Sequence, residues 1–103
     1  MPNWISVAQI SDFPPGTWKT VDVDDASVAV FNVEGHYYAI ANICTHDGGS
    51  LSGGRLEGDN IICPRHGARF CVRTGEVKSP PAYEDVITYP VRVENGEVQV
   101  SSI

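Results

Sequence analysis

Two short segments of the chain combine cysteine with histidine, the residue types that bind soft and borderline metal ions. Cys44-Thr45-His46 is the first segment and Cys63-Pro64-Arg65-His66 is the second, with 16 residues between His46 and Cys63. Each segment offers one thiolate and one imidazole within about one turn of backbone, and nearby glycines allow the chain to wrap closely around a bound group. The sequence therefore predicts a metal centre held by Cys44, His46, Cys63 and His66.

The order of these residues bears on which metal they hold. Zinc accepts two cysteines and two histidines in a tetrahedral site, but usually takes the cysteines from one loop and the histidines from another. Here each loop supplies one of each type. This mixed order favours a two-metal cluster between facing loops, with both cysteines on one iron and both histidines on the other. A structural zinc site is the alternative.

The elements that position these loops have the pattern of β-strands. Residues 28–33 and 37–41 are two β-rich runs on either side of a turn near Gly35. Residues 88–93 form a further run, and the chain turns back after it at Asn95-Gly96. Residues 18–24 also alternate between apolar and polar side chains. We find no helical stripe over three turns, so the sequence predicts an all-β fold.

The middle of the chain differs from both flanks in charge and composition. Residues 44–78 carry a net charge of +1 and are rich in glycine, whereas residues 1–43 sum to -4 and residues 79–103 to -3. This pattern predicts a loop-rich lobe inserted into an acidic β scaffold.

Length and composition exclude several classes of protein. A chain of 103 residues fits one domain, and a net charge of -6 argues against a nucleic-acid-binding protein. Three cysteines are too few for a disulfide scaffold. Since no basic amino-terminal region or long apolar run is present, we expect no targeting signal and no membrane association, and a cytoplasmic location.

The spacing Cys44-x-His46-(x16)-Cys63-x2-His66 resembles the motif of Rieske [2Fe-2S] proteins. The resemblance is greatest to the small Rieske-type ferredoxins of bacterial aromatic ring-hydroxylating dioxygenase systems. It implies one Rieske domain over residues 1–103, with an antiparallel β-sandwich-like basal domain and a cluster-binding lobe over about residues 43–82. Further positions also match the family: Gly67, Phe70, Thr74-Gly75 and Pro80-Pro81.

The resemblance also implies a cofactor and a function. Cys44 and Cys63 would ligate the buried iron of one [2Fe-2S] cluster, and His46 and His66 the outer iron. The chain would be a soluble, monomeric one-electron carrier in aromatic hydrocarbon catabolism, taking electrons from a flavin-dependent ferredoxin reductase and passing them to a terminal oxygenase. It would not itself be an enzyme. The alternatives are a small Rieske subunit of another redox enzyme, such as nitrite reductase, and a zinc-stabilised interaction module without redox activity.

Four positions depart from the high-potential respiratory branch of that family. Gly49 and Arg65 stand where those proteins carry a second pair of cysteines, so the corresponding disulfide cannot form. Ala68 and Phe70 stand where serine and tyrosine hydroxyls lie near the cluster sulfurs. With fewer hydrogen bonds to sulfur, we expect a reduction potential near the lower end of the family range, about -150 mV.

The remaining cysteine and histidine have no assigned chemistry. Cys71 lies in an expected strand and is interpreted as a buried, inert thiol. His36 follows Gly35 and is interpreted as an exposed turn residue.

Overall fold

The computed structural model describes residues 3–102, and within that range it contains strands and one short 3-10 helix but no α-helix. Across these residues, no helix is long and apolar enough to span a bilayer. The elements, in chain order, are β1 (Trp4–Gln9), η1 (Ile10–Asp12), β2 (Trp18–Val23), β3 (Ala26–Val33), β4 (His36–Ala41), β5 (Arg55–Glu57), β6 (Asn60–Ile62), β7 (Arg69–Cys71), β8 (Val77–Ser79), β9 (Thr88–Tyr89), β10 (Val91–Glu94) and β11 (Glu97–Ser101).

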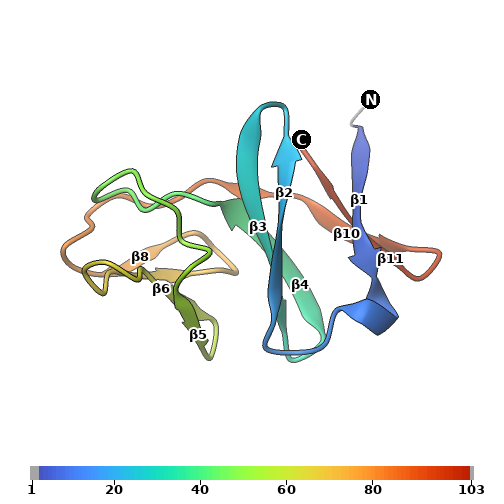
Figure 1. Ribbon diagram of the computed structural model, residues 1–103, viewed down its shortest axis with the longest axis horizontal. Coiled ribbons are helices and arrows are strands. Elements are labelled where there is room, and N and C mark those ends of the chain that lie inside the picture. The colour runs from blue at the N-terminus through green and yellow to red at the C-terminus, as the bar shows by residue number, and fades with distance from the viewer. Residues whose placement is uncertain (1–2, 103) are drawn as a thin grey trace.

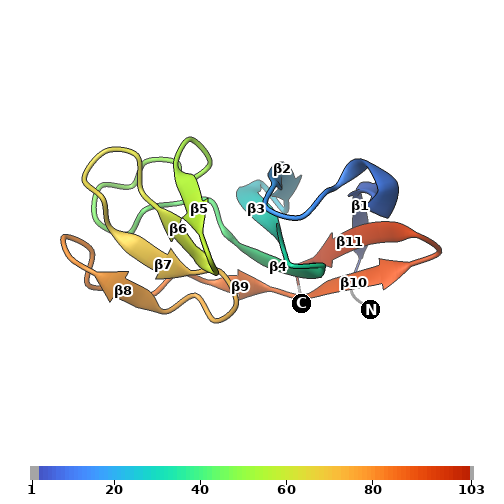
Figure 2. The ribbon, with the colours of Figure 1, turned by 90° about the horizontal axis from the view of Figure 1, so that it is seen from below.

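The strands form three antiparallel sheets, which confirms the all-β prediction. Their strand orders are β1-β11-β10, β2-β3-β4-β9 and β5-β6-β7-β8. Both ribbon views place β5–β8 at one end of the molecule and the sheet of β1, β10 and β11 at the other, with β2–β4 between them (Figures 1 and 2). The third sheet belongs to the lobe that carries the two cysteine–histidine loops.

Two hairpins turn where the sequence predicts. The β3–β4 turn uses Glu34 and Gly35 at φ 54° and 89°, and the β10–β11 turn uses Asn95 and Gly96 at φ 52° and 75°. Two-residue turns with positive φ at both positions match the right-handed twist of the strands they join. These turns fix the register of both hairpins.

The run at residues 88–93 was predicted as one strand, and this prediction is wrong. Thr88–Tyr89 (β9) pairs with β4, whereas Val91–Glu94 (β10) pairs with β11 in a different sheet. Pro90 separates the two segments; it has no N–H to donate to a ladder, while its carbonyl accepts a hydrogen bond from Ser101 N–H at 3.1 Å. The chain therefore passes from one sheet to the other at this proline.

Strand β3 contributes to two separate cores, because successive side chains of a strand point to opposite faces. Ala29 and Phe31 pack with buried residues of the lobe, whereas Val28 and Val30 pack against the β1–β11–β10 side. All four side chains are fully buried. The lobe is therefore packed onto the scaffold through a shared core.

Candidate metal centre

The two cysteine–histidine segments form turns of the same shape. We call residues 44–49 loop 1 and residues 63–68 loop 2. In loop 1, Cys44 N–H donates to Gly49 O and Gly48 N–H donates to Cys44 O, both at 2.7 Å. In loop 2, Cys63 N–H donates to the carbonyl oxygen five residues later at 2.8 Å. The N–H four residues after Cys63 donates to the Cys63 carbonyl oxygen at 3.1 Å, so the pattern is the same as in loop 1.

Glycine is required at the same point of each turn. Gly48 has φ 76° and Gly67 has φ 77°, values that only glycine adopts without strain. Each turn thus closes on itself and presents its cysteine and histidine from a compact loop.

The structure brings all four predicted ligands to one place. Cys44 and Cys63 are 0% and 2% exposed, whereas His46 and His66 are exposed. The two imidazole rings lie with their centroids 5.0 Å apart at an angle of 81°. The site therefore has a thiol side inside the lobe and an imidazole side facing solvent.

The donor set suits a soft or borderline metal centre, with two thiols on its buried side and two imidazoles on its exposed side. Burial raises the pKa of the Cys44 thiol, and the adjacent Cys63 adds to that effect, so a bound cation would favour the thiolate form of Cys44. Among the described residues, a group of three donor atoms that lie within 4.8 Å of one another comes from Cys44, His46 and Asp47 of loop 1.

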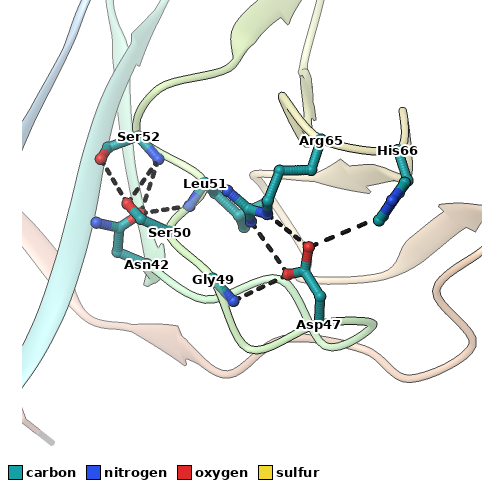
Figure 3. Close-up of polar contacts among 8 residues, drawn as sticks. All are labelled: Asn42, Asp47, Gly49, Ser50, Leu51, Ser52, Arg65 and His66. Carbon is teal, nitrogen blue, oxygen red and sulfur yellow. Dashed lines mark hydrogen bonds and ion pairs between the residues drawn. The ribbon is translucent and has the colours of Figure 1, made fainter.

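Asp47 is a site residue that the sequence analysis missed. Arg65 of loop 2 donates to both of its carboxylate oxygens, Nε to Oδ2 at 2.5 Å and Nη2 to Oδ1 at 3.1 Å, and Gly49 N–H donates to Oδ1 at 2.9 Å (Figure 3). Oδ2 also lies 3.9 Å from His66 Nδ1. The hydrogen bond from Arg65 holds the pKa of Asp47 far below its usual range. This carboxylate therefore connects the two loops.

Asn42 holds the chain that follows loop 1. Its Oδ1 accepts hydrogen bonds from the backbone N–H groups of Leu51 and Ser52, each at 2.9 Å, and from the Ser50 hydroxyl at 3.2 Å (Figure 3). Trp18 of β2 adds a hydrogen bond from Nε1 to Ser52 O at 2.9 Å. The loop is thus fixed to the scaffold just beyond the metal centre.

A third segment approaches loop 1 from the carboxyl-terminal side. Pro80-Pro81 begins this segment, and the Thr45 hydroxyl donates to Glu84 O at 2.7 Å. The side chain of Tyr83 is 80% exposed. The hydrogen bond between Thr45 and Glu84 therefore holds this segment against loop 1.

The other positions named from the sequence lie as follows. Ala68 and Phe70 are fully buried in the same core as Cys44 and Cys63. All three cysteines are free thiols, and Cys71 is buried in β7 as predicted. Burial raises the pKa of Cys71, but hydrogen bonds from Thr74 and the turn backbone outweigh that effect and leave the pKa lowered. His36 is exposed, as predicted, but it is the first residue of β4 and not a turn residue.

Two matched turns that each present a buried cysteine and an exposed histidine, on a four-stranded antiparallel lobe, define a two-loop iron–sulfur protein. The family model described as "Rieske [2Fe-2S] domain" matches residues 3–90. The chain belongs to the Rieske [2Fe-2S] family, and its cofactor is one Rieske [2Fe-2S] cluster with cysteine and histidine ligands.

The chain is also similar to named proteins along almost its whole length. It is 47% identical to the biphenyl dioxygenase ferredoxin subunit of Pseudomonas sp. (strain KKS102), covering 95% of this chain and 91% of that one. It is 40% identical to the ferredoxin component of the naphthalene 1,2-dioxygenase system of Pseudomonas putida, covering 95% and 94%.

The chain is also similar to solved structures along almost its whole length. A chain from the complex of reduced oxygenase and oxidized ferredoxin in carbazole 1,9a-dioxygenase aligns with a TM-score of 0.91 at 42% identity, covering 95% of this chain and 92% of that one. The putative NADH-dependent nitrite reductase small subunit of Mycobacterium tuberculosis aligns with a TM-score of 0.88 at 25% identity, covering 100% and 97%. These matches bear out the Rieske fold expected from the sequence.

Proposed function

We propose that this chain is a ferredoxin that carries single electrons to a terminal ring-hydroxylating oxygenase, with Cys44, Cys63, His46 and His66 as the cluster ligands. The observation that carries the proposal is the pair of matched turns, which place two buried thiols beneath two exposed imidazole rings. The similarity to ferredoxin components of dioxygenase systems supports the assignment. The chain itself makes or breaks no substrate bond.

The cysteines and the histidines of the site have different roles in such a carrier. When bound, the cluster supplies one-electron chemistry. Cys44 and Cys63 would hold it from the buried side of the lobe, in the same core as the fully buried Phe70 and Leu51. The imidazole rings of His46 and His66 occupy the exposed side and shorten the path to a docked partner. Two thiolates in place of four also make the oxidised centre neutral, which raises its potential relative to an all-cysteine cluster.

The proposal includes partners and organisation. We assign residues 1–103 to one Rieske domain, with residues 43–82 as its cluster-binding lobe. We expect a flavin-dependent ferredoxin reductase as electron donor, a monomeric carrier in the cytoplasm, and aromatic hydrocarbon catabolism as the setting.

The first test is the cluster and its histidines. Purified protein is expected to contain two irons and two acid-labile sulfides per chain and to give the EPR spectrum of a Rieske centre on reduction. His46→Ala and His66→Ala should each abolish electron delivery to the oxygenase, and His36→Ala should leave it unchanged because His36 lies at the exposed start of β4, outside loops 1 and 2. Electron delivery that persists in His66→Ala would contradict the ligand assignment.

A second candidate is a small Rieske subunit within a stable redox enzyme. The similarity to the putative nitrite reductase small subunit favours it. A large subunit that co-purifies with this chain would support that role over a free carrier.

A further inference from the structure

We propose that Asp47 and Arg65 are positioning residues whose ion pair ties loop 1 to loop 2 and slows loss of the cluster. We call this ion pair the interloop tie. The inference rests on the proposed function, because it takes the cysteines and histidines of both loops to be ligands. A ligand group held by two loops is released only when the loops separate, so a contact that joins them acts directly on the release rate.

The tie connects one loop backbone to the other. The guanidinium of Arg65 engages both oxygens of Asp47, the bidentate geometry in which such pairs are strongest. Gly49 N–H holds the same carboxylate within its own loop. The backbone hydrogen bonds of the two turns close each loop on itself, so the joining contact comes from side chains.

The tie is more shielded from water than other ion pairs of the lobe. The side chains of Arg65 and Asp47 are 36% and 21% exposed. Arg55 and Glu57, by contrast, are 72% and 47% exposed. Because solvent weakens exposed pairs, the interloop tie should contribute more than its neighbours.

The absence of a side chain at Gly49 leaves space for the Arg65 guanidinium of the interloop tie. A Cβ atom at this position would lie 2.5 Å from Arg65 Cζ and 2.6 Å from Nη2, closer than these atoms can approach. The φ angle of Gly49 is not in the left-handed region, so backbone conformation does not require glycine there. The missing side chain makes room for the guanidinium, and an added methyl group would push it away from Asp47.

This space gives a test that removes no charge. The loaded protein is mixed with excess iron chelator, and the loss of cluster absorbance is followed in wild type, Arg65→Gln and Gly49→Ala. The matched controls are Arg69→Gln, which breaks the Arg69–Glu57 pair in the same lobe, and Gly53→Ala, whose added methyl group would make only an ordinary contact at 3.8 Å.

We expect Arg65→Gln and Gly49→Ala to release the cluster about fivefold faster than wild type, because each change breaks or displaces the contact between the two loops. Both controls should stay within about twofold. High salt should accelerate release from wild type and have little effect on Arg65→Gln. In the double variant Asp47→Asn/Arg65→Gln, release should be no faster than in Arg65→Gln alone, because both changes break one contact.

Release at the wild-type rate in both Arg65→Gln and Gly49→Ala would overturn the inference, as would equal acceleration in the controls. If Arg65→Gln fails to fold, Gly49→Ala and Arg65→Lys decide the matter, since both keep the charge but lose the bidentate contact. Wild-type protein without iron and sulfide would refute the proposed function instead, so the two failures are distinguishable.

Discussion

Two positions that could place a hydroxyl group near the cluster sulfurs carry only hydrocarbon side chains. Ala68 and Phe70 are fully buried and belong to the same core as Cys44 and Cys63. Sulfur atoms gain negative charge on reduction, so a hydrogen bond to them stabilises the reduced state more than the oxidised one. The residues at these two positions therefore bear on the potential.

Adding a hydroxyl at either position should raise the reduction potential. For Phe70→Tyr and Ala68→Ser, a differential hydrogen bond of about 1 kcal/mol corresponds to about 40 mV for one electron. Redox titration followed by EPR measures the shift. Phe13→Tyr is the control, because Phe13 is equally buried but lies in the other core. If neither lobe variant raises the potential, the hydrogen-bond explanation is wrong.

The four proposed ligands could be identified from the sequence, but the contact that joins their loops could not. Cys44, His46, Cys63 and His66 stand out by type and spacing alone. Asp47 and Arg65 are common solvent-exposed types, and their pairing depends on two loops that face each other in space. The sequence nevertheless contained one indication of this contact, since Asp47 directly follows His46 and Arg65 directly precedes His66.

At the scale of elements, the turn between β7 and β8 joins the lobe to the segment before β9. Gly75 in this turn has φ 79°, and its N–H donates to Cys71 O while its carbonyl accepts from Val86 N–H, both at 2.8 Å. A Cβ at Gly75 would lie 2.2 Å from Val86 O. Because that oxygen is backbone, it cannot move aside cheaply.

Two glycines of similar φ should therefore respond differently to the same substitution. Gly75→Ala combines left-handed strain with a backbone clash and should cost about 3 kcal/mol or more in the free energy of unfolding. Gly96→Ala has φ 75° but no atom within 4 Å, so strain alone should cost about 1–2 kcal/mol. Urea unfolding measures both. Equal losses would show that the approach to Val86 does not matter.

Sequence patterns predicted elements well where the signal was local. Glu34-Gly35 and Asn95-Gly96 identify their hairpins because the turn residues themselves supply positive φ. Residues 88–93 look like one strand because their side chains are uniformly β-forming. Val91 pairs with Val100 in the local β10–β11 hairpin, but Tyr89 pairs with the distant Ala39, so the break at Pro90 had only the proline itself as a signal.

Across the whole molecule, charge follows the division into scaffold and lobe. The molecule extends 40 × 27 × 19 Å, with the lobe at one end of it (Figure 2). Several carboxylates of the lobe are paired with arginines of the same lobe, and Glu57 accepts from both Arg69 and Arg55. The acidic excess consequently belongs to the scaffold, and the end that carries the histidines is close to neutral.

These pairs predict how stability depends on pH. The hydrogen bond from Arg69, followed by weaker effects of Arg55, lowers the pKa of Glu57 below its ordinary value of 4.5. A carboxyl group with a lowered pKa in the folded state stabilises the fold above that ordinary value and loses this contribution as the pH falls through the folded pKa. The free energy of unfolding should therefore decline below about pH 4.5.

Urea unfolding at a series of pH values checks this expectation. Glu57→Gln should flatten the decline, and Glu34→Gln, in the exposed β3–β4 turn, should leave it as in wild type. The same slope in Glu57→Gln and wild type would assign the acid sensitivity to other carboxylates.

The pairing of β1 with β11 has a consequence for biosynthesis. Trp4 lies opposite Ser101, so β1 is translated long before the strand with which it pairs. The lobe strands β5 to β8 instead pair each with the next, within residues 55–79. Because local pairings form quickly and distant ones wait for chain that does not yet exist, the nascent lobe should become ordered while β1 is still an unpaired edge open to chaperones.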